Sequence, residues 1–398
     1  MLTRAGFRGL GDSTSPRGAT VLELLFDIVY VFALARLAGR IGDDLTIVRH
    51  TLLSESGQTL LIFTAMWMIW SLNAMMASTF DPGRTDLQVL LLTTMFGTLI
   101  LAVSLPQAFG ERGVIFSITY VVLQVGRPLY LTVALRGHPM QRGPARVLTW
   151  HLVSGVLWIA GGASGGLGRG VFWTIALSIE VLGAATNWPT PIRANRGGGV
   201  RIAFGHLAER YNQIFMIALA EVVLEAGAAV SFPGLSTERT IVLVAAFLAV
   251  VAFWRIYFYH IGPIRAASAS SAGEELQLSQ WASFSLLLIV AGIICTAVGF
   301  GQVIEEPDPP IDWALLVVIF GGPALFLIGR NYLEPTTRAA GGRCRALILG
   351  VVALAVAAPP MMFLRPVAAV VSAALILTGI AIYDGLLHPR GSDANPAL

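Results

Sequence analysis

Charged residues are scarce in this chain. Asp, Glu, Lys and Arg make up 12% of its 398 residues, whereas 56% are hydrophobic, and the mean hydropathy is +0.74. Soluble domains carry roughly a quarter charged residues, because their surface faces water. A chain of this length with half that share cannot cover a water-facing surface. The composition therefore excludes a soluble protein and predicts one embedded in a membrane.

Lysine is absent: all 26 basic residues are arginines, and the formal net charge is +3. Proteins that bind nucleic acid gather their basic residues on one face, with aromatic residues between them. Here the arginines are scattered through short segments between apolar runs. The sequence therefore predicts no nucleic-acid partner.

Cysteines are few, and motifs of metal or phosphate chemistry are not evident. Cys295 and Cys344 lie in different segments, without a second cysteine or a histidine at metal-ligand spacing. The glycine-rich stretch 161–170 lacks the Gly-Lys-Ser/Thr ending of a phosphate-binding loop, so we expect a flexible connection between helices. No HExxH zinc motif occurs. The sequence predicts no metal and no cofactor, and it favours a function other than catalysis.

Long apolar segments account for most of the chain. A helix needs about 20 mostly apolar residues to cross a bilayer. Twelve segments approach that length, namely 21–39, 57–78, 87–108, 114–135, 147–163, 169–187, 208–231, 240–260, 280–303, 312–333, 345–364 and 366–387. The fifth and the last two are short or interrupted by proline. We therefore predict an all-α transmembrane bundle of about twelve spans, within a range of ten to twelve.

The arginines favour one orientation of these spans. Cytoplasmic connections of membrane proteins carry an excess of basic residues. With twelve spans and a cytoplasmic N-terminus, the arginine-rich segments 4–17, 136–146, 193–201 and 330–345 all fall on the cytoplasmic side. The acidic segment 305–308 falls on the opposite side. Both termini are then predicted to be cytoplasmic.

The first and seventh apolar segments resemble each other. Residues 26–35 align with residues 211–220 at a constant offset of 185, so that aromatic residues coincide twice, Asp27 meets Asn212, and Ala-Leu-Ala recurs. The alternative is chance resemblance between apolar helices. A true repeat would place two six-helix halves in the same orientation, as in parallel-repeat transporters.

Such a repeat divides the chain into two halves. Residues 1–190 would form the first six-helix half and residues 206–398 the second. The Gly- and Arg-rich segment 191–205 would be a cytoplasmic linker between them.

Ionisable residues in the first segment are candidates for function. Asp or Arg at the centre of a membrane helix costs about 2.5–3.5 kcal/mol on insertion scales, so it needs a partner, water or a task. Glu23, Asp27 and Tyr30 lie four and three residues apart, on one stripe of a helix. Two neighbouring carboxylates raise each other's affinity for protons, which predicts proton binding. The alternative for Glu23 is stabilisation of the helix N-terminus.

The seventh segment carries the densest group of such residues: His206, Glu209, Arg210 and Glu221. We predict that Arg210 pairs with Asp27, since both lie a few residues into helices that the repeat would relate. Glu221, near the middle of its segment, is the strongest candidate for binding a solute or proton, whereas the alternative for Glu209 is helix capping. Two further candidates for substrate or proton binding interrupt other apolar segments, Glu180 and Asp384.

Two of these motifs carry a family resemblance. Residues 23–33, Glu-Leu-Leu-Phe-Asp-Ile-Val-Tyr-Val-Phe-Ala, resemble the opening signature Glu-Leu-Phe-Phe-Asp-Leu-Val-Phe-Val-Phe-Ala of the bacterial low-temperature-requirement A (LtrA) family. The His206-Leu-Ala-Glu-Arg210 and Ile217-Ala-Leu-Ala-Glu221 motifs resemble its second signature, His-Phe-x-Glu-Arg followed by Ile-x-Leu-Gly-Glu-Ser. Ala220 and Val222 depart from the usual Gly and Ser. The resemblance covers essentially the whole chain and implies a multi-pass protein of the bacterial inner membrane.

The family name records a growth phenotype and no reaction, so three functions remain. The leading hypothesis is a secondary transporter or permease coupled to protons through its intramembrane carboxylates. Its partners would be the lipid bilayer and a small solute or proton; the sequence indicates no particular solute or oligomeric state. One alternative is a non-catalytic membrane sensor or structural protein involved in low-temperature growth. Another is an intramembrane enzyme acting on a lipid or isoprenoid.

Overall fold

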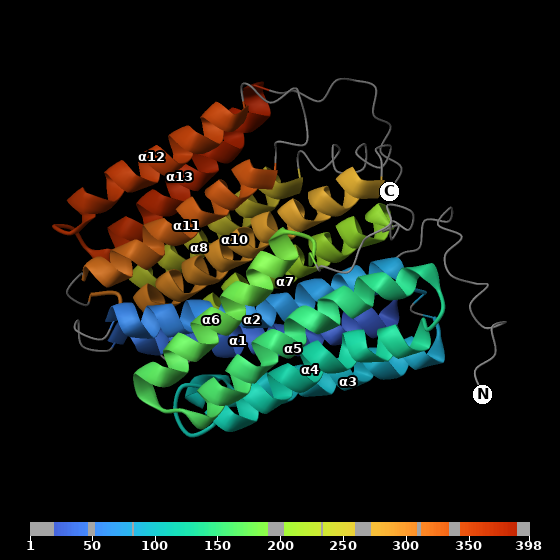
Figure 1. The fold of residues 1–398 in the computed structure, drawn as a ribbon. Helices are drawn as coiled ribbons and strands as arrows, with labels where there is room; N and C mark the ends of the chain where they lie inside the picture. The colour runs from blue at the N-terminus through green and yellow to red at the C-terminus, as the bar shows by residue number, and fades with distance from the viewer. Residues whose placement is uncertain are drawn as a thin grey trace. The chain divides into compact units, whose positions relative to one another are not determined.

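The computed structural model describes residues 20–46, 52–81, 83–189, 203–231, 234–258, 272–308, 312–333 and 343–387. Across these ranges the regular structure is entirely helical, with twelve α-helices (Figure 1) and two short 3-10 turns. The predicted all-α class is therefore confirmed.

Each of the twelve helices contains most of one predicted apolar segment. They are α1 (Val21–Thr46), α2 (Leu52–Thr79), α3 (Thr85–Ser104), α4 (Gly113–Ala134), α5 (Arg142–Ala163), α6 (Gly166–Ala185), α7 (Phe204–Ser231), α8 (Thr237–Phe258), α10 (Ala272–Glu305), α11 (Trp313–Leu333), α12 (Arg343–Met361) and α13 (Pro366–Leu387). The 3-10 turns are η2 (Leu105–Gln107) and η3 (Pro139–Gln141).

Nine helices of the described part are long and apolar enough to cross a membrane. The three others are α1, α5 and α12. Helix α1 is set apart by its charge, since Glu23, Asp27 and Arg36 lie within one membrane-spanning length of it. Helix α12 is set apart by the short length of its apolar part, Ala346–Met361. Helices of membrane-spanning length and composition are thus confirmed, whereas the full count of twelve spans stays a prediction.

The described residues fall into two compact units. The first unit comprises those within Met1–Ile214 and Ala267–Ser283, and the second comprises those within Phe215–Ala266 and Phe284–Leu398. The division into halves at 1–190 and 206–398 stays a prediction. Most of the predicted linker, 191–205, lies outside the described residues.

In the first unit, α4 packs on α5, α5 packs on α6, and α1 packs on both α2 and α3. The glycine-rich stretch 161–170 contributes to this packing. The only non-helical residues in it are Ser164 and Gly165, so the expectation of a flexible connection was wrong. A Cβ at Gly162 of α5 would lie 2.9 Å from Cβ of Ser117 on α4, and the glycine therefore permits the close approach of the two helices.

In the second unit, α13 packs on α8 and α12, and α11 packs on α12. Small residues also bring α10 and α11 together. A Cβ at Gly292 of α10 would lie 2.6 Å from the carbonyl oxygen of Gly322 on α11. Interfaces between membrane helices use such residues because lipid supplies no hydrophobic drive for association, so that close van der Waals contact must provide the stability.

The aromatic core of the first unit includes tryptophans with polar contacts. Trp67, Trp70 and Trp158 are at most 1% exposed. Burial on this scale identifies them as core residues of the unit, and the indole N–H of each must then find an acceptor within the protein.

Candidate functional site

The N-terminus of α1 is closed by Thr20 and Glu23. The backbone N–H and hydroxyl of Thr20 donate to Oε2 of Glu23 at 2.8 and 2.9 Å, and the N–H of Glu23 lies 3.4 Å from the threonine hydroxyl. This is a capping box, in which a Thr and a Glu three residues later satisfy each other's backbone donors. These hydrogen bonds therefore support the alternative role considered for Glu23, stabilisation of the helix N-terminus.

Asp27, one turn further along α1, pairs with Arg210 of α7. Nη1 of Arg210 donates to Oδ2 of Asp27, and Nη2 donates to Oδ1, both at 2.7 Å. Nη1 also donates to Gln213 at 2.8 Å, and the indole N–H of Trp70 donates to Asp27 at 3.2 Å. The predicted pairing of Asp27 with Arg210 is therefore present. It is bidentate, the geometry that gives the strongest Arg–carboxylate contact.

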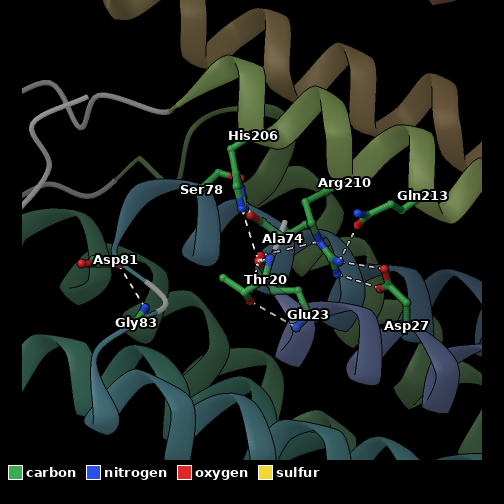
Figure 2. A network of polar contacts seen from close by, with 10 residues as sticks. All are labelled: Thr20, Glu23, Asp27, Ala74, Ser78, Asp81, Gly83, His206, Arg210 and Gln213. Atoms are coloured by element: carbon green, nitrogen blue, oxygen red, sulfur yellow. Dashed lines mark hydrogen bonds and ion pairs between the residues drawn. The ribbon is translucent and has the colours of Figure 1, made fainter. Parts of the chain in front are cut away.

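Glu23 also faces α7. Its Oε2 lies 3.3 Å from Nε2 of His206, and its Oε1 lies 3.8 Å from Nε of Arg210. The other ring nitrogen of His206, Nδ1, lies 3.0 Å from the hydroxyl of Ser78 on α2. Helix α7 is held at this end because the N–H of Ala203, just before it, donates to the carbonyl of Ser78 at 2.9 Å. Figure 2 shows these side chains converging from the three helices.

Glu23, Asp27, His206 and Arg210 together form what we name the α1–α7 cluster. Their exposed fractions are 1%, 1%, 5% and 1%. When both carboxylates are ionised and His206 is neutral, the cluster carries a net charge of −1. One added proton would bring the cluster to neutrality. Because a buried net charge is costly, the neutral state is favoured.

Two proton arrangements fit the contacts of His206. The Ser78 hydroxyl lies 2.8 Å from the carbonyl of Ala74 as well as 3.0 Å from His206. A hydroxyl has one hydrogen to donate. If Ser78 donates to His206, the ring is neutral and donates its Nε2 hydrogen to Glu23. If Ser78 donates to Ala74, its oxygen accepts from Nδ1, and the contact between Nε2 and Glu23 takes its hydrogen either from a cationic ring or from a protonated Glu23 carboxyl; in both cases the cluster holds one more proton. The two states differ by one proton and one hydroxyl rotation.

Tyr30 lies next to this cluster without joining its hydrogen bonds. Its hydroxyl is buried and has no hydrogen-bond partner among the described residues. Its ring centroid lies 6.4 Å from that of Phe26 and 6.3 Å from that of Trp70. Tyr30 therefore contributes to the aromatic wall beside Asp27.

The remaining candidates on α7 and α13 are Glu209, Glu221 and Asp384. Glu209 is exposed. Glu221 belongs to the second unit, where it is 2% exposed and its Oε2 has no hydrogen-bond partner in the described part of the chain. Asp384, also of the second unit, is 7% exposed.

Glu180 of α6 is the centre of a second buried group. It accepts hydrogen bonds from Tyr120 of α4 at 2.5 Å, and from Ser154 and Trp158 of α5 at 2.7 and 2.9 Å. Nδ1 of His151 lies 3.6 Å from the same carboxylate. Glu180 is fully buried, and its three donors come from two other helices, so it ties α4, α5 and α6 together.

A metal centre is not formed by the described residues, in which no group of three His, Cys, Asp or Glu side chains could hold an ion. The α1–α7 cluster places two carboxylates and one histidine beside the Arg210 guanidinium.

Comparison with known proteins identifies the family. The family model described as bacterial low temperature requirement A protein (LtrA) matches residues 18–382. The chain belongs to the LtrA family. This LtrA protein is also 33% identical, over 329 residues, to an uncharacterized protein of Rhizobium meliloti (strain 1021), with 81% of this chain and 78% of that relative covered. No solved structure matches it.

The two LtrA signatures meet at the α1–α7 cluster. Glu23 and Asp27 come from the first signature, and His206 and Arg210 from the second. The Glu23–His206 and Asp27–Arg210 contacts each join residues 183 apart in the sequence. The motifs that carry the family resemblance are therefore those that bring α1 and α7 together.

Several residues of these groups were not predicted from the sequence of this LtrA protein. The Thr-x-x-Glu spacing before an apolar run could have identified the capping box of α1. In α4, Tyr120, Gln124 and Arg127 recur at helical spacing on one face of an apolar helix, which could have indicated a buried polar group. Ser78 offered no comparable signal, since a lone serine in an apolar helix commonly bonds to its own backbone.

Proposed function

We propose that this LtrA-family chain is a secondary transporter of the bacterial inner membrane, in which a proton bound by the α1–α7 cluster is coupled to the movement of a small solute. The observation that carries the proposal is that the contacts of His206 with Ser78 and Glu23 can be made with or without one additional proton on the His206–Glu23 pair. A site that gains or loses a proton with little displacement of heavy atoms suits repeated turnover.

The roles within the cluster follow from its charges. Asp27 and Arg210 form the fixed pair, because two parallel hydrogen bonds join the guanidinium to the carboxylate. Glu23 and His206 form the exchangeable pair, because their contact requires a hydrogen from one of them. The state with one proton fewer carries a net charge of −1, which favours a cationic group in place of that proton. The solute proposed to exchange with the proton is therefore cationic.

Glu221 is the proposed second carboxylate of the transport path. It lies on α7, the helix that carries His206 and Arg210, and it is buried with one carboxylate oxygen lacking a partner among the described residues. A buried carboxylate of this kind needs a proton or a cation. Glu221 would supply that site in the second unit.

The topology proposed for this transporter has twelve spans, with both termini in the cytoplasm and two parallel six-helix repeats. The one-to-one match of helices and predicted apolar segments supports the count. The distribution of arginines between alternate connections supports the orientation.

Proton flux in proteoliposomes tests the coupling. With a pH-sensitive dye inside the vesicles, wild-type protein should move protons when cationic solutes from a panel are added outside. Glu23→Gln and His206→Gln should each abolish that flux while the protein still inserts and elutes as a single species. Glu111→Gln, a change at an exposed carboxylate in the connection between α3 and α4, is the matched control and should behave as wild type. Wild-type flux in both cluster variants would contradict the proposal.

One observation favours a second candidate, a non-catalytic sensor or structural protein. The Asp27–Arg210 pair is buried and bidentate, as expected of a contact that only joins two helices. In that case an apolar replacement of both partners, Asp27→Leu with Arg210→Met, should retain growth at low temperature in a strain that lacks its own copy. Under the transport proposal the same double variant should fold and fail to support growth.

A further inference from the structure

A pocket separate from the α1–α7 cluster opens on the first unit. Its volume is about 150 Å³. Helices α2, α4 and α5 supply most of its wall, and residues after α6 and one residue of α10 complete it. The wall is mainly apolar and includes Met75, Met76, Phe80, Leu131, Val147 and Trp188. We name it the α4–α5 pocket.

Two arginines of the wall make this apolar pocket cationic. Arg127 of α4 is 5% exposed and donates to the carbonyl of Ile69 at 3.3 Å and to Oε1 of Gln124 at 2.5 Å. Arg146 of α5 is half-buried. Neither forms an ion pair with any residue that the structure describes. Buried charges are normally paired, so Arg127 lacks the anion that its position calls for.

Neutral groups hold Arg127 in the wall. Gln124 accepts from Arg127 and points its own amide N–H at the Tyr120 hydroxyl, 3.3 Å away, which in turn donates to Glu180. The bonds run in one direction, from the guanidinium to the distant carboxylate. They orient Arg127 without neutralising it at the pocket, because Glu180 is two side chains away.

A strained segment forms another side of the pocket. Asn187 and Trp188 have φ angles of 63° and 52°, in the left-handed region, which Asn adopts readily after a helix but a bulky aromatic residue rarely does. Both side chains line the pocket. Asn187 accepts from Gln280 of α10 at 2.5 Å, and the N–H of Trp188 donates to the carbonyl of Gly183 at 2.7 Å. Strain of this kind is held by its surroundings and occurs at binding sites more often than elsewhere.

We propose that the α4–α5 pocket binds a small amphipathic carboxylate. An apolar cavity of about 150 Å³ takes a body the size of a benzene ring, so an aromatic ring or short alkyl chain fits against Leu131 and Trp188. The carboxylate accepts hydrogen bonds from Arg127 and Arg146. This site is independent of the proton site, since it shares no residue with the α1–α7 cluster.

Binding of 4-phenylbutyrate to the purified full-length protein tests the proposal, with 4-phenylbutanol as the uncharged probe of nearly the same shape. Isothermal titration in detergent should show binding of the acid and at least about tenfold weaker binding of the alcohol, since hydrogen bonds to charged groups contribute more than neutral ones. Equal affinity for the two probes, or no binding of the acid, would overturn the proposal.

Variants locate the site on the protein. Arg146→Gln and Arg127→Gln should each weaken binding of 4-phenylbutyrate by about tenfold or more, which corresponds to the loss of one charged contact. Val147→Phe, which fills the pocket from its half-buried rim, should remove binding even if Arg127→Gln fails to fold. Arg142→Gln is the matched control, because Arg142 lies one turn earlier on α5, is exposed and does not line the pocket. An effect of Arg142→Gln as large as that of Arg146→Gln would assign the binding to general surface charge and overturn the site.

Binding in nanodiscs tests whether the pocket takes a dissolved acid or a lipid. In nanodiscs of zwitterionic lipid, 4-phenylbutyrate should bind as it does in detergent, and replacing part of that lipid by anionic phospholipid should leave its affinity unchanged. If anionic phospholipid instead displaces the probe, the pocket belongs to a lipid, and the assignment to a small carboxylate is wrong.

Discussion

Replacing Asp27 with asparagine should destabilise the protein by about 3–5 kcal/mol, the usual cost of removing one partner of a buried ion pair. Asp27 accepts two charge-assisted hydrogen bonds of 2.7 Å from Arg210, and both side chains are 1% exposed. Without the carboxylate, the guanidinium stays buried with only Glu23, 3.8 Å from its Nε, to offset its charge. Because Glu23 offers partial compensation, we expect a value near the lower end, about 3 kcal/mol.

An exposed ion pair provides the matched control for Asp27. Glu238 and Arg365 approach to 2.8 Å, but their side chains are 42% and 66% exposed. Exposed pairs contribute about 0–1 kcal/mol, because water and salt screen them. Glu238→Gln should therefore change stability little, although its contact is almost as short.

Unfolding of the full-length protein in mixed micelles measures both effects. Denaturing detergent is titrated in, and the loss of helix is followed by circular dichroism. The double change Asp27→Leu with Arg210→Met should recover most of the lost stability, since apolar replacements of a buried pair are often neutral or stabilising. The reasoning is refuted if Asp27→Asn costs no more than Glu238→Gln.

Three further predictions concern other helices. Glu180→Gln should lower stability by about 2 kcal/mol, because three hydrogen bonds to a buried carboxylate become bonds to a neutral group; the same unfolding titration measures it. Gly292→Ala should cost about 1–3 kcal/mol, because its Cβ would lie 2.6 Å from the carbonyl of Gly322, and an unchanged unfolding midpoint would show that α10 and α11 can separate freely. Thr20→Ala should cost about 1 kcal/mol by removing the capping hydroxyl of α1, and Thr20→Ser should restore it; equal stability of the two variants would rule out the cap.

The sequence predicted the helices well because their signal is local. Apolar runs of about 20 residues set their number and approximate bounds, and in lipid a spanning segment has few alternatives to a helix. The glycine-rich stretch 161–170 was mispredicted because composition alone does not distinguish a flexible loop from a close helix contact. At Gly162 the lack of a side chain serves packing against Ser117.

The candidate site was predictable only in part. Asp27 and Arg210 could be paired because each is a costly charge in an apolar helix and the apparent repeat related their positions. The contact of Glu23 with His206 depends on how α1 and α7 pack, and the contribution of Ser78 depends on α2 as well. Side chains of ordinary residue types acquire such roles only through tertiary contacts, which a single sequence does not specify.

The protonation state of His206 tests the central claim most directly. Nitrogen NMR of full-length protein in lipid bilayers, with histidine rings labelled with ¹⁵N and the His206 signal identified by its loss in His206→Gln, reports which ring nitrogens carry hydrogen. We expect the ring to exchange between a form that carries hydrogen on Nδ1 and a form that carries it on Nε2 alone. We also expect Glu23→Gln to change the proportion of the two forms, because Glu23 is the partner of Nε2. A ring that keeps one fixed protonation state throughout would contradict a proton exchanged between α1 and α7.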